Sequence, residues 1–339
     1  MNSNRKIAYV GFAFLHHKNT RAGYNRIKHY IHYDYVFDCQ KYFDVYFKDY
    51  KNQILVFLMK VSSKLFRAKI FPWYIIKIWW KGLFRDDIVF HFIYAESLYL
   101  PFPKYTGKNK VVCTVHQPLN ILKEWGQIDK LKEVDSIILV GNSEIEKIKE
   151  ITGRDNVIYI PHGISTDFYH PIVSVKKEHM VLTVGDWLRD FTFANKVYKR
   201  LLETDMDLRI VVVSREKNRE YLDNHPRLSF LSGISDEELR DLYLKSSILF
   251  LPLIRYTANN SLLEASACGC NIVISSDFPD NSYIPSEYLH LVSMDVDKVT
   301  DIIKNSYSSD YNEKLAKYIE DNFSWNVIGK RTEEYLRSL

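Results

Sequence analysis

Cysteine is scarce in this sequence, and nothing in its placement suggests a metal site or a disulfide framework. The 339 residues include four cysteines, Cys39, Cys113, Cys268 and Cys270. They form no Cys-x-x-Cys pair and show no spacing with histidine that is typical of zinc ligands. A disulfide-stabilised secreted scaffold is therefore excluded, a reducing compartment is expected, and no metal site is predicted.

Long apolar runs are missing as well. No stretch of eighteen apolar residues occurs, so no segment is expected to cross a membrane. Residues 1–11 lead from a polar start into a strand pattern, without the apolar centre and cleavage site of a signal peptide. We therefore expect a cytoplasmic protein. Nucleic-acid recognition motifs, internal repeats and low-complexity segments are also lacking, and no nucleic-acid partner is predicted.

Short apolar runs, each closed by Gly, Pro or a polar residue, are what the sequence does contain. Hydrophobic residues make up 46% of it and charged residues 26%, as in a folded globular protein. The runs predict buried parallel strands separated by helices, which is an α/β fold. The strands are expected at residues 5–11, 87–94, 110–116, 136–141, 180–185, 208–214, 228–233, 247–254 and 271–275. Two helices are predicted to begin with capping boxes, Ser143 with Glu146 and Ser235 with Glu238.

Charge is unevenly distributed along the chain. Residues 1–170 carry 25 Lys and Arg against 16 Asp and Glu, whereas the remainder carries 21 against 26. The stretch Ser62–Arg85 holds six of these basic residues, no acidic residue and three of the six tryptophans. Such a stretch suits an anionic membrane surface, which predicts peripheral association at the inner face of the membrane. The alternative is a helix that packs its aromatic rings on the sheet and leaves its lysines in water.

The segment Asn259–Cys270, with the sequence Asn-Asn-Ser-Leu-Leu-Glu-Ala-Ser-Ala-Cys-Gly-Cys, lies between two predicted strands. Asn259, Asn260 and Ser261 are favourable N-cap residues, and Gly269 is a favourable helix stop. A short helix here directs free N–H groups and the positive end of its dipole toward the carboxyl ends of the strands. This arrangement predicts an anion site, with Glu264 one turn into the helix. The alternative is an ordinary crossover helix with Glu264 in solvent.

The pattern Leu-Leu-Glu-Ala-x-Ala-x-Gly between two strands resembles the donor-site helix of retaining glycosyltransferases with the GT-B fold. That family includes glycogen synthase and many bacterial polysaccharide glycosyltransferases. The resemblance implies two Rossmann-like domains facing a central cleft, here placed at 1–171 and 172–315, with residues 316–339 returning to the first domain. In the family two glutamates eight positions apart flank this loop. Glu264 matches the second, which contacts ribose, whereas Tyr256 replaces the first and Asn259 replaces the usual glycine.

Further positions at expected strand ends match the family's first domain. Gly11 and Gly23 bracket the loop after the first strand, where the family contacts donor phosphate or acceptor. His116 ends a strand at the position of a family histidine that contacts the donor sugar. Gly163, in Pro161-His162-Gly163-Ile164, matches the turn of the family's Pro-Asn-Gly-Val-Asp segment. The resemblance thus implies roles for Gly11 and Gly163 in donor binding and for His116 in catalysis.

The second domain departs from the family at the loop after its first strand. The family holds the donor diphosphate with two cations there, whereas Asp186-Trp-Leu-Arg-Asp-Phe191 contains one, Arg189. A guanidinium suits a diphosphate, so Arg189 is the candidate for that role, the alternative being a structural pairing with Asp186 or Asp190. The predicted donor-binding residues are Gly11, Gly163, Arg189, Ser214, Arg215, Asn259, Asn260, Ser261, Leu262 and Glu264, with His116 and Arg189 as the predicted catalytic residues.

The predicted activity is transfer of a hexose from a nucleotide sugar to an acceptor hydroxyl with retention, in surface polysaccharide or glycolipid assembly. The expected donor is a UDP- or GDP-sugar, the expected acceptor is a glycan or a lipid-linked acceptor, and no other cofactor is expected. Two-carboxylate glycosidases are disfavoured, because no suitably spaced pair of carboxylates stands out. Two alternatives stay open: a sugar epimerase or phosphorylase-like enzyme of the same fold, and a catalytically silent nucleotide-sugar binder or partner subunit.

Overall fold

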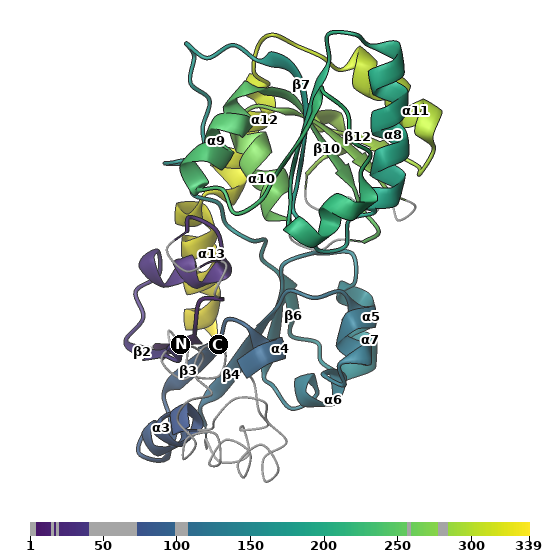
Figure 1. The fold of residues 1–339 in the computed structure, drawn as a ribbon. Coiled ribbons are helices and arrows are strands. Elements are labelled where there is room, and N and C mark those ends of the chain that lie inside the picture. Colours follow the sequence, from purple (N-terminus) through teal and green to yellow (C-terminus); the bar gives the residue numbers. More distant parts are fainter. Residues whose placement is uncertain are drawn as a thin grey trace, which may run out of the picture. The chain divides into compact units, whose positions relative to one another are not determined.

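The chain folds into two compact units, each with a six-stranded parallel sheet (Figure 1). The computed structural model describes residues 5–14, 17, 20–40, 73–98, 108–255, 259–276 and 284–339. Unit 1 combines residues 1–163 with 325–339, and unit 2 comprises residues 164–324. The predicted α/β class with two Rossmann-like units is confirmed. The predicted domain limits at 171/172 and 315/316 remain predictions, and the contacts divide the chain at 163/164 and 324/325.

The sheet of unit 1 has the strand order β2-β1-β3-β4-β5-β6. Its strands are β1 (Lys6–Gly11), β2 (Tyr35–Asp38), β3 (Ile88–Phe92), β4 (Lys110–Val115), β5 (Ser136–Leu139) and β6 (Val157–Tyr159). Strands β3 and β5 are buried along their whole length, and β1 and β4 at all but the first residue. Burial on both faces explains why continuous apolar runs mark these strands. Because all pairs are parallel, Gly11 and the residue after β4, His116, share one edge of the sheet.

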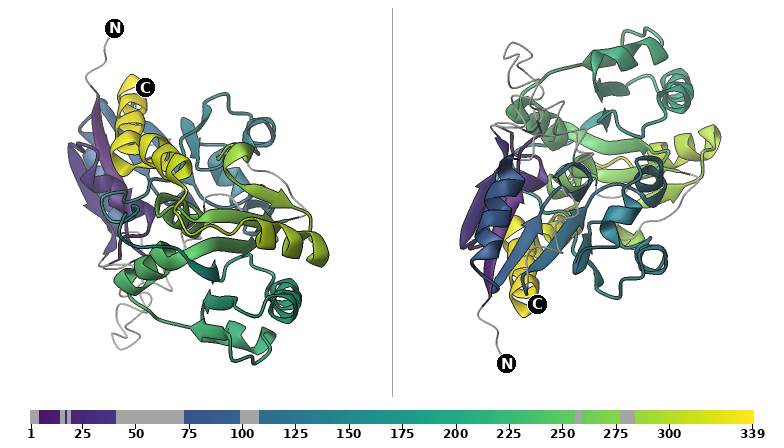
Figure 2. Two further views of the ribbon diagram at one scale, coloured as in Figure 1. Left: turned by 90° about the horizontal axis from the view of Figure 1, so that it is seen from above. Right: turned by 90° about the horizontal axis from the view of Figure 1, so that it is seen from below.

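Helices cover both faces of this sheet. They are η2 (Tyr24–His29), α3 (Trp73–Leu83), α4 (Ala95–Leu98), α5 (Leu119–Glu124), α6 (Ile128–Leu131), α7 (Ile145–Thr152) and α13 (Trp325–Ser338). The last helix, α13, packs against β1, β3 and η2, and the yellow helix lies beside the purple first strand in both views of Figure 2. It buries Trp325, Ile328 and Leu336. The end of the chain therefore supplies part of the core of unit 1.

The sheet of unit 2 has the strand order β12-β11-β10-β7-β8-β9. Its strands are β7 (Glu178–Val184), β8 (Arg209–Val213), β9 (Leu228–Leu231), β10 (Ser246–Pro252), β11 (Asn271–Ser275) and β12 (His290–Val292). Strand β10 is buried throughout and pairs with β7 and β11 at the centre. The carboxyl ends of β7 and β10 therefore lie side by side, which brings the loop after β7 next to the segment before the family-like helix.

Unit 2 is completed by α8 (Phe191–Thr204), η4 (Glu216–Tyr221), α9 (Asp236–Lys245), α10 (Asn260–Ala267), η5 (Ser286–Tyr288), α11 (Val296–Asn305) and α12 (Glu313–Phe323). The capping box predicted at Ser235 and Glu238 is confirmed at the start of α9. The box predicted at Ser143 is wrong, because the residue before α7 is Glu144 and no side chain caps that helix. Glu144 instead accepts a hydrogen bond from the Leu119 N–H at 2.7 Å.

The basic aromatic stretch is described only in part. Residues 62–72 lie outside the described residues, and α3 begins at Trp73. In and just after this helix, Lys77 is exposed, and so are Trp80, Leu83 and Phe84, with 63%, 50% and 71% of their surfaces accessible. In the part of the chain that the structure describes, no helix combines the length and the apolar character needed to cross a membrane.

Candidate functional site

The segment that begins α10 is a capped helix N-terminus, as predicted. Asn259 is its N-cap, and its Oδ1 accepts hydrogen bonds from the Leu262 N–H at 3.2 Å and the Ser261 hydroxyl at 2.8 Å. The Leu262 side chain is buried, and its N–H is engaged by the cap. Asn260 and Ser261 form the first turn, where backbone donors have no partner within a helix. The predicted capped helix start is therefore present at the carboxyl edge of the sheet, and its use as an anion site stays a prediction.

Arg189 places a positive charge at this helix N-terminus. Its Nη2 donates to Asn259 Oδ1 at 3.2 Å and to Ser261 Oγ at 3.0 Å. The same guanidinium donates to the carbonyl oxygens of Val184, at 3.2 and 3.3 Å, and Trp187, at 2.9 Å. The positive charge of Arg189 faces the positive end of the helix dipole, and the two together strongly favour binding of an anion between them. Arg189 is thus held by protein oxygens at the site, and Asp186, one partner of the predicted alternative pairing, forms an ion pair with Arg215.

The loop that carries Arg189 is held in an unusual conformation. Gly185 has φ 100°, a backbone conformation that favours glycine. A Cβ at this position would lie 3.0 Å from Arg189 Nη2 and would crowd the guanidinium. Leu188 has φ 55°, a left-handed conformation that is uncommon for a non-glycine residue. Its carbonyl accepts from the Ile254 N–H at 3.0 Å, and the Asp190 N–H donates to Pro252 O at 2.9 Å. Strain that is fixed by surrounding contacts is typical of functional loops.

The two predicted residues after β8 lie beside this loop but make different contacts. Ser214 is buried, and its hydroxyl donates to the Gly185 carbonyl at 3.0 Å and accepts from Asn218 Nδ2 at 2.8 Å. Arg215 is 65% exposed and forms an ion pair with Asp186. Ser214 thus supports the loop, while Arg215 and Asp186 neutralise each other at its rim. A direct role of either residue in donor binding stays a prediction.

Glu264 is buried rather than solvated. Its residue is 3% exposed, and its Oε2 accepts a hydrogen bond from the Tyr243 hydroxyl of α9 at 2.9 Å. Burial raises the pKa of Glu264 from 4.5 to about 8, although the Tyr243 hydrogen bond opposes the rise. At neutral pH this side chain is a neutral carboxyl group, able to donate as well as accept a hydrogen bond. Tyr243 has no motif of its own and was not singled out in the sequence.

In unit 1, His116 lies against a carboxylate that the sequence motifs did not indicate. Glu96, in α4, accepts hydrogen bonds from the backbone N–H groups of His116 and, at 3.0 Å, Gln117. Its other oxygen is 3.8 Å from His116 Nδ1. Burial would raise the pKa of Glu96, but its hydrogen bonds and charge interaction with His116 outweigh burial and hold the pKa below 4.5. Glu96 is therefore a buried carboxylate that fixes the His116 segment.

Aromatic rings enclose the His116 imidazole. The rings of Tyr24 and Tyr94 each lie 4.9 Å from it, and the ring of His162 lies 6.4 Å away. Both nitrogens of the His116 ring are buried, so contact with a sugar requires the ring to turn. His162 is buried as well, and burial lowers its pKa to about 3, so it is neutral. The predicted role of His116 in catalysis stays a prediction.

The two predicted glycines of unit 1 both have a packing reason. A Cβ at Gly11 would overlap Ile93 and the Tyr9 hydroxyl, and a Cβ at Gly163 would overlap the indole of Trp325. These contacts explain glycine at both positions without a ligand. Their predicted contacts with phosphate remain untested.

Of the predicted site residues, Arg189, Asn259 and Ser261 are in direct contact, with Ser214 supporting the same loop. Within the described ranges, no three His, Cys, Asp or Glu side chains are arranged to hold a metal ion. Two Asp-x-Asp sequences, 205–207 and 295–297, are engaged elsewhere, since Asp205 pairs with His179 and Asp295 caps α11.

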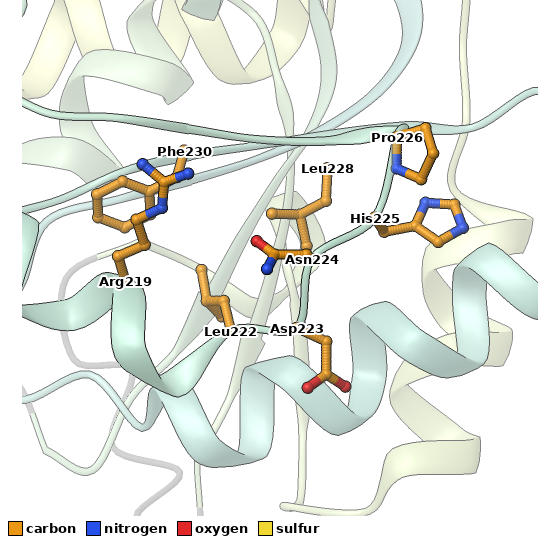
Figure 3. Close-up of a pocket in the computed structure, with 8 residues that line it drawn as sticks. All are labelled: Arg219, Leu222, Asp223, Asn224, His225, Pro226, Leu228 and Phe230. Carbon is orange, nitrogen blue, oxygen red and sulfur yellow. The ribbon is translucent and has the colours of Figure 1, made fainter.

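A separate groove of about 420 Å³ lies on unit 2 (Figure 3). It is lined by Arg219, Leu222, Asp223, Asn224, His225, Pro226, Leu228 and Phe230, none of which is a predicted site residue. The groove lies beside the edge strand β9, and strands β8 and β7 separate β9 from β10, the strand that precedes α10.

Comparison with known proteins points to one family. Residues 179–305 match the family model described as Glycosyl transferases group 1. The gpi3 subunit of phosphatidylinositol N-acetylglucosaminyltransferase from Schizosaccharomyces pombe is 19% identical over 228 residues. That match covers 62% of this chain and 50% of the relative, so the chain spans about half the length of this curated relative.

Solved structures extend the likeness to the whole chain. Anabaena Alr3699/HepE, determined in complex with UDP and glucose, has a TM-score of 0.63, 12% identity and coverage of 99% of this chain and 100% of that chain. The α,α-trehalose 6-phosphate synthase of Burkholderia multivorans has a TM-score of 0.60, 12% identity and 98% coverage of both chains. Residues 179–305 thus match the glycosyl transferases group 1 model, and the chain is similar over almost its whole length to proteins with the GT-B fold, which confirms the fold that the resemblance implied.

Proposed function

We propose that this protein transfers a sugar from a nucleotide-sugar donor to an acceptor hydroxyl, with retention at the anomeric carbon. The donor is a UDP- or GDP-sugar, and the product belongs to a surface polysaccharide or a glycolipid. The proposal is supported by the glycosyl transferases group 1 domain and by a neighbour of the same fold whose structure contains UDP and glucose.

The observation that carries the proposal is the contact of Arg189 with the N-terminus of α10. The guanidinium touches Asn259 and Ser261 at the point where the helix directs its backbone donors outward. A nucleoside diphosphate leaves this reaction with increased negative charge, and positive groups already in position stabilise that charge in the transition state. Arg189 and the first turn of α10 are thus the groups that favour departure of the diphosphate.

The remaining predicted residues are assigned to the two ends of the donor. Glu264 holds ribose hydroxyls with its buried carboxyl group, whose second oxygen is fixed by Tyr243. His116 orients or stabilises the donor sugar after its imidazole turns out of the ring cluster. Ser214 keeps the Gly185 loop in place, and Arg215 lies at its rim.

The acceptor proposed here is lipid-linked. The Schizosaccharomyces pombe relative is named for transfer of N-acetylglucosamine to phosphatidylinositol, a lipid. Around α3, the exposed rings of Trp80 and Phe84 lie 5.2 Å apart, near the exposed Lys77. Exposed aromatic rings next to lysine suit the head-group region of an anionic membrane, where a lipid-linked acceptor is found.

A second candidate function is nucleotide-sugar binding without catalysis. The guanidinium of Arg189 already donates to four protein oxygens, from Val184, Trp187, Asn259 and Ser261. An arginine held this way can shape the loop without meeting a diphosphate. Tyr256, in place of the family's first glutamate, lies outside the described residues and points to the same alternative.

A donor panel tests both candidates. The purified protein is heated with UDP, GDP, ADP or CMP, and a ligand that binds the native state raises Tm. Labelled nucleotide sugars of the bound base are then incubated with it, and transfer or slow donor hydrolysis supports the transferase. Binding without either reaction supports the silent binder. If no nucleotide binds, both proposals fail.

Two arginine variants test whether Arg189 binds the diphosphate of the donor. Arg189→Ala is expected to lower the rate of transfer about 10²–10³-fold, as loss of a donor to developing charge does. Its affinity for the free nucleoside should change little. Arg209→Ala is the matched control, since Arg209 is 60% exposed at the other end of the same sheet, paired with Glu178. Equal losses for nucleoside and nucleoside diphosphate would assign Arg189 a structural role.

A further inference from the structure

Trp187 is a large apolar side chain left half exposed in the loop that carries Arg189. It lies after β7 with 52% of its surface accessible. Most tryptophans bury the greater part of their rings, because indole is among the side chains that gain most from leaving water. Its neighbour across the loop, Ile254, is 48% exposed. Trp187 and Ile254 are thus exposed apolar residues of the segments that follow β7 and β10.

The backbone around Trp187 is fixed while its side chain is not buried. The Trp187 carbonyl accepts from Arg189 Nη1 at 2.9 Å, and Leu188 is held at positive φ by the Ile254 N–H. A bridge between Arg189 and Leu253 pins the other side of the loop. The exposed indole is thus presented by a constrained loop, which lowers the entropy lost when a ligand packs on it.

Arg189 links the loop of Trp187 to the start of α10. Glu264 lies one helical turn from the start of α10, about 6 Å along the axis. Arg189 touches that start with one nitrogen and the Trp187 carbonyl with another. The start of α10 and the backbone of Trp187 therefore contact the same guanidinium, which the proposed function assigns to the diphosphate. In a nucleotide sugar the diphosphate joins ribose to the sugar, so with Glu264 assigned to ribose the group left for the loop beside Arg189 is the sugar.

We propose that the indole of Trp187 is the platform on which the sugar ring of the donor stacks. One face of a pyranose presents C–H groups, and these pack favourably on the electron-rich face of an aromatic ring. The inference rests on the proposed function, and it makes Trp187 a residue that selects for the sugar rather than for the nucleotide.

The test compares affinities for nucleotide and nucleotide sugar by calorimetry, with UDP against UDP-glucose and UDP-N-acetylglucosamine, and GDP against GDP-mannose. Trp187→Ala is expected to weaken binding of the preferred nucleotide sugar about 5–20-fold and to leave the affinity for the nucleotide within about twofold, as for loss of an aromatic contact of about 1–2 kcal/mol. Trp187→Phe should recover part of the loss. The backbone carbonyl that Arg189 uses remains in both variants.

A fluorescence measurement gives a second readout. Nucleotide sugar, but not the nucleotide, should change the emission of the wild type, and the change should be absent in Trp187→Phe. Trp125→Phe, at a tryptophan that is 45% exposed in unit 1, is the control and should keep it. An equal loss of affinity for both ligands, or no loss, overturns the platform. A wild type that binds nucleotide sugar no better than nucleotide also overturns it, whereas a wild type that binds neither overturns the proposed function itself.

Discussion

Glu264 shows how one buried carboxyl group can oppose stability while it serves binding. Its pKa in the folded chain, about 8, lies above the ordinary 4.5. Between these values the unfolded chain loses a proton that the folded chain keeps, so this group's contribution to stability is complete below pH 4.5 and is lost as pH rises toward 8.

Glu264→Gln should therefore flatten the dependence of unfolding free energy on pH in this window and leave the variant more stable than the wild type at pH 8. The gain is a few kcal/mol at most, since one pKa unit corresponds to about 1.4 kcal/mol. Glu264→Leu, which removes the hydrogen-bonding group altogether, should lower nucleotide affinity by about 0.5–1.5 kcal/mol, as for a lost neutral hydrogen bond to ribose. Urea titrations from pH 5 to pH 8 and calorimetry measure the two effects. Identical pH profiles for both proteins would contradict the raised pKa, and unchanged nucleotide affinity would contradict the ribose contact.

The pKa of Glu96 is shifted in the opposite direction to that of Glu264. Its pKa is held below 4.5 by His116, so its contribution to stability is present above pH 4.5 and is lost as pH falls through the lowered pKa. Glu96→Gln should lower the unfolding free energy by about 1–3 kcal/mol at pH 7, because an amide accepts the two backbone N–H groups less strongly than a carboxylate does. The difference from wild type should shrink below pH 4.5. Glu124→Gln, at an exposed residue of α5, should behave as wild type.

Individual residues were the hardest feature to predict. Asn259 and Ser261 were singled out from the strand–helix pattern, because capping chemistry is local, and Arg189 from the family resemblance, as the one cation of the loop Asp186–Phe191. Glu96 and Tyr243 were not predicted, because their partners lie 20 and 21 positions away in the sequence. The periodicity of helices and strands gives no information about contacts at such separations. The conformation of Leu188 was equally hidden, since leucine gives no sign of positive φ.

At the scale of elements, prediction worked where strands are buried on both faces. The central strands of both sheets were anticipated from apolar runs, whereas β12, a three-residue edge strand, was not. The capping box of α9 was predicted correctly, since the Ser235 hydroxyl accepts from the Glu238 N–H and the Glu238 carboxylate accepts from the Ser235 N–H. At α7 the same spacing misled, because Glu144 is used by the neighbouring α5.

Lys177 joins the ends of two helices in unit 2. Its buried Nζ donates to the carbonyl of Tyr243, near the end of α9, at 2.8 Å and to that of Cys268, the C-cap of α10, at 3.0 Å. A cation at helix C-termini satisfies carbonyls that lack helical partners and matches the helix dipole.

Replacing this lysine should loosen both helices. Lys177→Met keeps the apolar stem and is expected to lower the unfolding free energy by about 2–4 kcal/mol, because two buried carbonyls lose a charged donor. Lys176→Met, its exposed neighbour paired with Asp310, is the matched control and should change little. Denaturant unfolding measures both, and equal stabilities of the two variants would contradict the helix-end role.

At the scale of the molecule, the two units differ in net charge. Unit 1 carries 28 Lys and Arg against 17 Asp and Glu, and unit 2 carries 18 against 25. A basic unit with exposed rings at α3 is the unit that an anionic membrane would attract, by about 1 kcal/mol for each basic residue near the surface.

We therefore expect the protein to float with vesicles that contain anionic lipid at low salt and to be released at high salt, because salt screens the attraction. Replacing Trp80 and Phe84 together by serine should weaken flotation and leave nucleotide binding unchanged. Trp125→Ser removes a comparably exposed tryptophan from the same unit and should have no effect. Failure of the wild type to float with anionic vesicles at low salt would end the membrane proposal.

The division of the chain into units has a consequence for biosynthesis. Unit 2 is one continuous segment, residues 164–324, whereas unit 1 needs the final residues 325–339 to complete its core. During translation unit 2 can close as soon as it has left the ribosome, while unit 1 waits with the surface beneath α13 uncovered. The helix α13 packs closely on the earlier part of unit 1, since the indole of Trp325 fills the space that a side chain at Gly163 would occupy. The first part of the chain to be synthesised therefore completes its core only after residues 325–339 have been made.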